Sequence, residues 1–241
     1  MPSQLWKIPL LLASARLYQQ STTPPNKPAA ASEKLKYGST TPDFMSTMTA
    51  RRIAKSTVSL MWVYSLVESA VIIAHNHPTP YTRKILSLLV RKEYSAANVR
   101  ITPLFLAGCA LLFSGCALRV ACYRELGRFF TWDLSIKPDQ KLITTGPYSV
   151  VRHPAYTGNC LIALGLVLAQ VSGGSWFTEC GGYGSPWTRA FAAVWLGWHL
   201  SKPYLLGKRV TVEDEVLRRE FGERWDEYAK RTPYRLFPFV Y

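Results

Sequence analysis

The sequence predicts an all-α, polytopic integral membrane protein with about four to five transmembrane helices and a cytosolic C-terminal helix. Its apolar residues come in blocks, and a helix needs about 20 residues to cross a bilayer core. The 29 Lys and Arg residues, against 15 Asp and Glu, gather largely between these blocks. A polar segment with helical periodicity follows the last block. A soluble helical bundle is the alternative, since a hydrophobic content of 48% would also fit that class.

The candidate spans are residues 57–74, 101–121, 158–171 and 190–206. The first two approach the required length. Glu68 interrupts the first, and Arg119 lies near the end of the second. The other two are shorter or more broken, and the last contains His199 and Lys202. We therefore expect two strong spans and two weaker ones.

The region before the first strong span has a different composition. Residues 8–15 are apolar but short, which fits a signal-peptide core, an interfacial helix or part of a spanning helix. Of these we expect a retained membrane-associated helix. Residues 21–50 are rich in Pro, Thr and Ser and predict an irregular linker. The predicted divisions are an N-terminal membrane-associated segment and linker, a first strong transmembrane helix with a basic loop, and a core that carries the motifs below, at residues 1–50, 51–100 and 101–241.

The distribution of basic residues predicts the topology. Cytosolic loops carry an excess of Lys and Arg, and residues 171–187 contain neither. We expect that loop to be lumenal, and residues 123–156 and 207–241 to be cytosolic. Residues 76–100 are basic yet fall on the lumenal side by counting, so either they form a basic amphipathic piece on the membrane surface or the helix count is wrong by one. Three basic residues that precede the first strong span place its amino end in the cytosol: Arg51, Arg52 and Lys55.

The formal net charge of +14 does not indicate nucleic-acid binding, because no RNA- or DNA-binding motif is present. Positive-inside topology and attraction to anionic lipid headgroups account for it more simply. The five cysteines have no metal-type spacing and are expected to be small buried hydrophobes. We expect the lipid bilayer as a partner, and neither nucleic acid nor a metal.

A first polar block, GPYSVVRHPAYTG, spans residues 146–158 at the start of the third apolar block. Gly-Pro is a turn signal, and Pro154 can begin a helix because its missing N–H is not needed there. His153, Ala155 and Tyr156 then lie at the helix entrance, where backbone N–H groups favour anionic ligand groups. The alternative is a loop cap whose Arg152 and His153 are solvated among the headgroups.

A second polar block runs from Arg209 to the carboxyl end. Arg209 and Glu213 are four residues apart and share a helix face, where a surface ion pair is the default interpretation. Gly222 interrupts this helix or ends its first part. Four residues recur at a spacing of three to four and predict a buried stripe: Leu217, Phe221, Trp225 and Tyr228.

Together the two blocks resemble the isoprenylcysteine carboxyl methyltransferase family and, more loosely, the membrane phospholipid methyltransferases. The resemblance covers roughly residues 100–241, and two separated motifs agree in order. Trp225 and Thr232 depart from the commonest residues of the family. The matching residues are Gly146-Pro147-Tyr148, Arg152 to Gly158, Glu213-Asp214, Leu217, Phe221-Gly222, Tyr228, Arg231 and Pro233.

The resemblance implies S-adenosyl-L-methionine as the methyl donor and the prenylated C-terminal cysteine of CaaX proteins as the substrate. It also implies a multi-pass protein of the endoplasmic reticulum membrane whose active site faces the cytosol. Arg209 is implied as the catalytic, substrate-binding residue beside the reacting carboxylate. The implied cofactor contacts are Gln140, Lys141, Leu142, Ile143, Tyr148, His153, Pro154, Ala155, Tyr156 and Glu213.

The chemistry of these residues fits a carboxylate acceptor. A C-terminal carboxyl group has a pKa of about 3.3–3.7 and is ionised at pH 7, so its methylation needs no general base. Arg209 can hold the carboxylate through two hydrogen bonds, and Glu213 can hold the amino group of the cofactor.

Three other interpretations stay open. Methylation of a phospholipid amine such as phosphatidylethanolamine would need a base near the donor methyl group. A cation such as Arg209 is not expected at that position. Sterol reductases have a similar carboxyl end (Pro-Tyr-Arg-Leu-Phe-Pro and a final Tyr), but they use NADPH and have more spans. A non-catalytic membrane protein is the third.

Overall fold

The computed structural model describes residues 4–27, 29 and 48–240, and within them every regular element is a helix. The predicted all-α class is therefore confirmed. Most of the predicted linker, residues 30–47, lies outside the described residues.

Four of the α-helices begin at a proline, as expected where the missing N–H costs nothing. Pro154 is one of these, which confirms the helix start predicted there. The α-helices are α1 Lys7–Thr22, α3 Met48–Asn76, α4 Pro80–Leu89, α5 Pro103–Leu126, α6 Pro154–Val171, α7 Trp176–Glu179, α8 Pro186–Phe221 and α9 Glu223–Arg231, with short 3₁₀ helices η3 Ala96–Asn98, η4 Gly127–Phe129 and η5 Gly146–Ser149.

Three helical segments of the described chain are long and apolar enough to cross a membrane: Met48–Asn76, Pro103–Phe129 and Pro154–Glu179. They correspond to the first three predicted spans. The fourth predicted span, residues 190–206, lies inside α8, which has 36 residues with Pro203 within it but lacks a sufficiently apolar window. Helix α1 has 16 residues, fewer than a bilayer core requires. Three candidate spans are thus established, and the count of four to five stays a prediction.

The chain forms two compact units, each assembled from three stretches. Unit 1 comprises Met1–Gln19, Thr57–Ser114 and Leu161–Ser201, and unit 2 comprises Gln20–Ser56, Gly115–Cys160 and Lys202–Tyr241. The two are described in turn.

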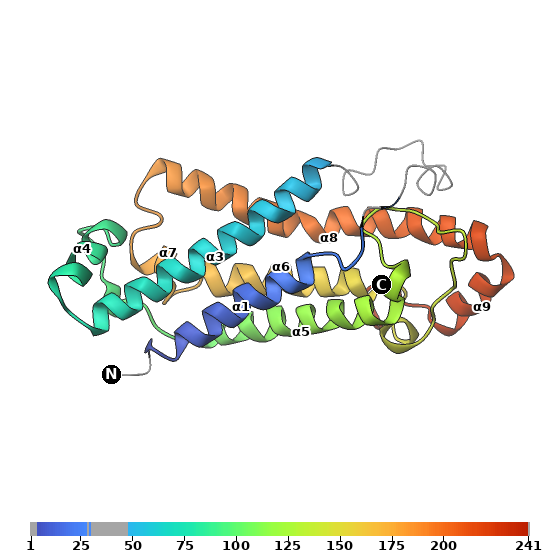
Figure 1. The fold of residues 1–241 in the computed structure, drawn as a ribbon, viewed down its shortest axis with the longest axis horizontal. Helices are drawn as coiled ribbons and strands as arrows, with labels where there is room; N and C mark the ends of the chain where they lie inside the picture. The colour runs from blue at the N-terminus through green and yellow to red at the C-terminus, as the bar shows by residue number, and fades with distance from the viewer. Residues whose placement is uncertain (1–3, 28, 30–47, 241) are drawn as a thin grey trace. The chain divides into compact units, whose positions relative to one another are not determined.

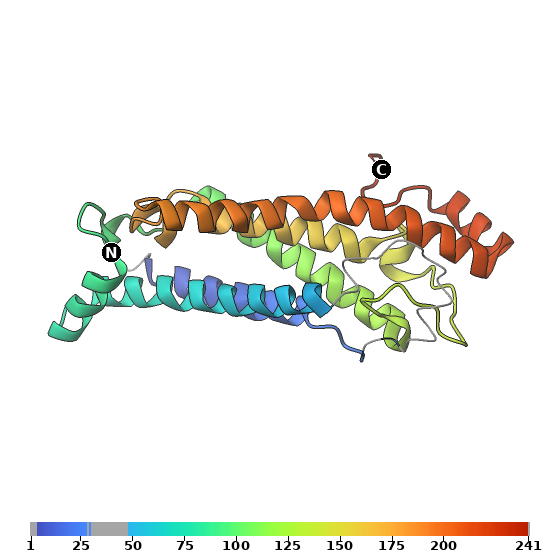
Figure 2. The same cartoon turned by 90° about the horizontal axis from the view of Figure 1, so that it is seen from above.

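The core of unit 1 joins α1, α3, α5 and α6. Leu11 of α1, Ile72 of α3 and Phe105 of α5 are almost fully buried in one cluster. Helices α1 and α3 run side by side (Figures 1 and 2), and the Trp62 indole N–H donates to the Gln19 side chain at 2.9 Å. Glycines let α5 and α6 approach closely, since a Cβ on Gly165 would lie 2.6 Å from the Gly108 carbonyl oxygen.

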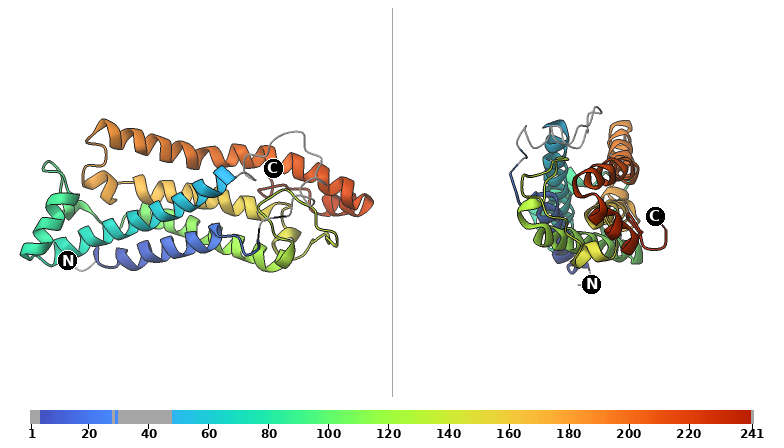
Figure 3. Two further views of the ribbon diagram at one scale, coloured as in Figure 1. Left: turned by 45° about the horizontal axis from the view of Figure 1, so that its top comes forward. Right: turned by 90° about the vertical axis from the view of Figure 1, so that its right-hand side faces the viewer.

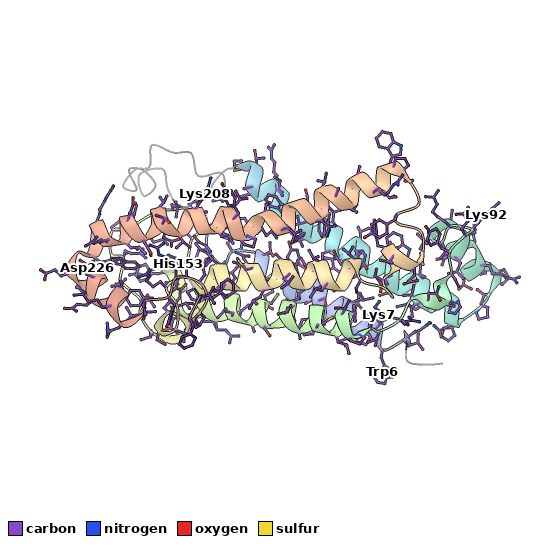
Figure 4. The ribbon with its side chains drawn as sticks, turned by 180° about the vertical axis from the view of Figure 1, so that it is seen from behind. Trp6, Lys7, Lys92, His153, Lys208 and Asp226 are labelled. Atoms are coloured by element: carbon purple, nitrogen blue, oxygen red, sulfur yellow. The ribbon has the colours of Figure 1, made fainter. Side chains whose placement is uncertain are left out.

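Glu68, the charge that interrupts the first span, has a partner in Lys7 of α1. Lys7 Nζ, labelled in Figure 4, lies 2.5 Å from Glu68 Oε1, donates to the Gly174 carbonyl at 2.7 Å and sits 4.4 Å from the centre of the Phe105 ring. The Trp176 backbone N–H donates to Glu68 Oε2 at 3.1 Å. Both charged side chains are 0% exposed. Burial of two charges carries a desolvation cost in free energy, which a buried ion pair offsets only with such additional hydrogen bonds.

The basic segment 76–100 contains the short helix α4, drawn in Figure 1 beyond the end of α3. Its ten residues include none that is buried. At about 1.5 Å per residue the helix covers roughly half of a bilayer core, so it does not span. The structure thus gives this segment a short helix without buried residues, which fits an amphipathic surface piece, and the helix count stays a prediction.

In unit 2, α8 turns into α9 at Gly222, whose φ of +56° suits a residue without a Cβ (Figure 3). The predicted stripe is fully buried at Trp225 and Tyr228 and half-buried at Leu217 and Phe221. After α9 the chain returns to the start of α6.

This returning segment pairs with residues 152–157. The Arg152 and His153 backbone N–H groups donate to the carbonyls of Tyr234 at 3.0 Å and Arg235 at 2.9 Å. The Thr157 hydroxyl donates to the Leu236 carbonyl at 2.6 Å. The second polar block therefore begins and ends against the first.

Candidate active site

The first polar block forms η5 and the entrance to α6, both in unit 2. Tyr148 of η5 is buried, and its carbonyl accepts a hydrogen bond from the Tyr228 hydroxyl at 2.7 Å. Burial, with smaller contributions from Cys122 and Glu213, raises the pKa of the Tyr148 phenol well above its ordinary value. Tyr148 is therefore neutral at physiological pH and positions the α6 entrance.

His153 is the point where the two polar blocks meet. Its side chain is 4% exposed, and its ring stacks on that of Tyr156 with centroids 5.6 Å apart and planes 6° apart. His153 Nε2 lies 2.7 Å from Asp214 Oδ1, and Nδ1 lies 3.7 Å from Glu213 Oε2. Both ring nitrogens therefore face carboxylates of α8.

Tyr156 and Glu213 make the second link between the blocks. The Tyr156 hydroxyl donates to Glu213 Oε2 at 2.6 Å. The Glu213 side chain is 27% exposed, so its carboxylate is accessible as well as anchored. The structure thus brings His153 and Tyr156 together with Glu213, which lies 57 or more positions further along the chain.

Arg209 lies one helical turn before Glu213 and is 8% exposed. Its guanidinium carbon lies 5.9 Å from the centre of the Tyr156 ring, and Nη2 donates to the Trp132 carbonyl. The carbonyl comes from the loop between α5 and η5. This cation therefore stands beside the same aromatic ring that Glu213 binds.

Asp214 is the residue of this cluster that sequence reasoning missed as a site residue. Besides His153, it faces Arg152 Nη2 and Arg235 Nε, each at 3.3 Å from Oδ2. The sequence signal was its place beside Glu213 in the matching motif. Arg235, however, lies 21 residues further along the chain, and only the return of that segment brings it to Asp214.

The loop residues predicted to contact the cofactor separate into two groups. Ile143 packs against the buried cluster that includes Tyr148 and Ala155. The contacts found for Gln140 are local ones, from its backbone N–H to the Lys137 carbonyl at 3.1 Å and from the Lys137 N–H to its side chain at 3.4 Å. Lys141 is exposed and Leu142 half-buried. Ile143 thus packs at the α6 entrance, whereas the contacts found for Gln140 stay within its own loop and the Lys141 side chain is exposed.

Arg119, the charge near the end of the second span, positions the α6 entrance. It donates to the Ala155 carbonyl at 3.1 Å, the Ser21 carbonyl at 2.8 Å and the Tyr123 hydroxyl at 2.6 Å. Gly158 makes room for it, because a Cβ there would lie 2.7 Å from Arg119 Cγ. Pro154 and Ala155 are both buried at this contact.

The cluster has the side chains expected of a binding site for a ligand that carries both positive and negative charges. Glu213 and Asp214 supply carboxylates with side chains 27% and 13% exposed. Arg209 supplies a guanidinium, and His153 and Tyr156 supply aromatic faces, which attract cations. Hydrogen bonds and ion pairs to neighbouring elements hold most of these groups in place, so the arrangement is preorganised.

Comparison with known proteins shows similarity to one class, the membrane methyltransferases. The family model described as phospholipid methyltransferase matches residues 104–180, which include the first polar block and end before Arg209. The match covers less than half of the chain.

Curated relatives narrow the class. Protein-S-isoprenylcysteine O-methyltransferase B of Arabidopsis thaliana is 29% identical over 135 residues, which are 55% of this chain and 58% of that protein. A probable protein-S-isoprenylcysteine O-methyltransferase of Oryza sativa subsp. indica is 30% identical over 135 residues, 55% of this chain and 60% of the relative. The resemblance found in the sequence is confirmed: over more than half of its length the chain is similar to isoprenylcysteine O-methyltransferases, and residues 104–180 match the phospholipid methyltransferase model.

Sterol reductases also match. The delta(14)-sterol reductase of Mus musculus is 29% identical over 103 residues, 42% of this chain and 20% of that protein. The chain thus spans about three-fifths of the methyltransferase relatives and one-fifth of this reductase.

Proposed function

We propose that this protein transfers a methyl group from S-adenosyl-L-methionine to the C-terminal carboxylate of a prenylated cysteine in CaaX proteins. The observation that carries the proposal is the meeting of the two polar blocks in unit 2. His153 and Tyr156 lie against Glu213, and Arg209 stands one turn away beside Tyr156.

The residues fit the cofactor by charge. At neutral pH S-adenosylmethionine carries an ammonium group, a sulfonium group and a carboxylate. Glu213 would hold the ammonium group through the part of its carboxylate that is accessible. The Tyr156 ring, on which His153 stacks, offers a face of the kind that attracts cations. The cofactor supplies, when bound, an electrophilic methyl group on its sulfonium sulfur.

Arg209 would bind and orient the acceptor. A carboxylate is ionised at pH 7, so the protein has no proton to remove and mainly has to align and desolvate the acceptor. A guanidinium binds a carboxylate through two parallel hydrogen bonds. The Trp132 carbonyl accepts from Arg209 Nη2 and fixes the side chain.

The prenyl chain would enter from the bilayer, because three apolar helices are long enough to cross it. We propose an endoplasmic reticulum location by family resemblance. A cytosolic active site is supported by the basic residues of segments 123–156 and 207–241, against the absence of Lys and Arg between 171 and 187.

Methylation of a phospholipid amine is the second candidate, because the matching family model carries that description. An ammonium acceptor must lose a proton before it attacks, which requires a base. The carboxylates and His153 are the groups of the cluster able to take that proton, but the cation at Arg209 disfavours a positively charged acceptor there.

Methyl transfer from labelled S-adenosylmethionine separates the candidates. Membranes that contain the chain would be given N-acetyl-S-farnesylcysteine and, in parallel, phosphatidylethanolamine. Base-labile label on the prenylcysteine is the expected result, because a methyl ester hydrolyses in base. Stable label in the lipid would replace the proposal with the second candidate, and label in neither, with the cofactor bound, would favour a non-catalytic or reductase-like protein.

A further inference from the structure

Helix α4 (Pro80–Leu89) presents an apolar face to its surroundings. Tyr81, Ile85 and Leu88 are 84%, 37% and 75% exposed, and their spacing of four and three places them on one side of the helix. Leu86 and Leu89, from another side, pack against the core of unit 1. In the part of the chain that the structure describes, one side of α4 therefore packs against the core of unit 1, and its apolar side with Tyr81, Ile85 and Leu88 is exposed.

The position of α4 in the chain brings it to the membrane boundary. The candidate span α3 ends at Asn76, and α4 begins at Pro80. Three intervening residues cannot carry it far from the end of the span. The turn is well defined, because the Thr79 and Thr82 side chains cap the helix reciprocally at 3.1 Å and 2.7 Å.

The charge around α4 is strongly positive. Residues 76–100 contain five Lys or Arg residues and a single acidic residue, Glu93. Arg83 and Lys84 on the helix, and Lys92 just after it (labelled in Figure 4), are exposed. A helix with an exposed apolar face flanked by Lys and Arg suits an anionic membrane surface.

We infer that α4 is an interfacial anchor that lies on anionic phospholipid headgroups of the same bilayer, with Tyr81, Ile85 and Leu88 at the acyl boundary. Arg83, Lys84 and Lys92 face the lipid phosphates. The inference does not rest on the proposed function, and it holds whichever side of the membrane this segment occupies.

The depth of single spin labels in reconstituted full-length protein tests the anchor. All five native cysteines are buried, so an introduced surface cysteine would be labelled selectively. Leu88→Cys reports on the apolar face, and Ser87→Cys, the exposed neighbour on another side of α4, is the matched control. Collision with oxygen and with a water-soluble nickel chelate would be measured in vesicles of phosphatidylcholine, with and without one-third phosphatidylserine.

The expected result is a Leu88→Cys label that collides mainly with oxygen and a Ser87→Cys label that collides mainly with nickel. Phosphatidylserine should deepen the first label, and Arg83→Gln with Lys84→Gln should abolish that shift. Equal nickel access at both positions would overturn the anchor, and equal depth in the two lipid mixtures would overturn its anionic specificity. Shielding of the Leu88→Cys label from both reagents would show a protein partner or second copy instead.

Discussion

Each unit contains a cluster of charged side chains, and the two clusters are built differently. In unit 1, Lys7 and Glu68 are both 0% exposed and are enclosed by a carbonyl, a backbone N–H and the Phe105 ring. In unit 2, Glu213 keeps 27% of its side chain exposed while it binds Tyr156. The first cluster satisfies its charges internally, whereas the second leaves an anchored carboxylate accessible.

This difference distinguishes a structural ion pair from the proposed binding site. Ionisable residues at membrane depth are functional candidates by default, and Glu68 would be one on sequence grounds alone. Its enclosure argues for a role in holding α1 against α3.

Lys7→Ala should lower the stability of the protein by about 3–5 kcal/mol, because it leaves the Glu68 carboxylate buried without its partner. Thermal unfolding in detergent would measure the loss. Arg16→Ala, an exposed change of the same type on α1, is the control and should be nearly neutral. An unchanged midpoint for Lys7→Ala would mean that the enclosed pair is not structural.

Arg209→Ala should reduce methyl transfer by about 100-fold or more, since it removes the group proposed to hold the acceptor. Cofactor binding, measured by titration calorimetry, should largely survive. Lys208→Ala removes an exposed charge at the preceding position and should leave turnover near the wild-type value. If the Arg209 variant lost cofactor binding, Arg209 would be a ligand of the cofactor and not of the acceptor.

Glu213→Gln should weaken cofactor binding by about tenfold, the loss of one charge-assisted hydrogen bond. Glu215→Gln makes the same chemical change at an exposed position of α8 and is the matched control. If the two variants bound the cofactor equally well, Glu213 would not be its ligand.

Asp214→Asn tests the intermediate case, a carboxylate 13% exposed that holds both His153 and two arginines. We expect a stability loss of about 1 kcal/mol, because the amide retains a hydrogen-bond acceptor but loses the charge. Cofactor affinity should fall several-fold through displacement of His153. Asp226→Asn, in the exposed pair with Arg218, should cost at most about 0.5 kcal/mol. If stability fell while cofactor affinity did not change, Asp214 would have a structural role, like the ion pair of unit 1.

Much of the fold could be predicted because apolar blocks and prolines act locally. The start of α6 at Pro154 and three of the spans follow from these signals. Whether residues 190–206 cross the membrane could not be predicted, since they continue into the polar half of the 36-residue helix α8. Whether such a helix enters a bilayer depends on its neighbours as well as its own hydropathy.

The candidate site was partly visible in the sequence. Spacing placed Arg209 and Glu213 on one face, and the family motifs selected His153 and Tyr156. Asp214 stood in the same motif, but its partner Arg235 and the pairing of residues 234–236 with the α6 entrance had no local signal.

The helical class, the apolar helices and the two polar blocks follow from the amino-acid sequence alone, because periodicity, proline and charge act over a few residues. Which charges pair depends on the tertiary structure. Lys7 and Glu68 are 61 positions apart, and His153 and Asp214 are also 61 positions apart, yet one pair is sealed and the other lies beside an accessible carboxylate. Enclosure depends on packing between distant helices, which no local pattern encodes.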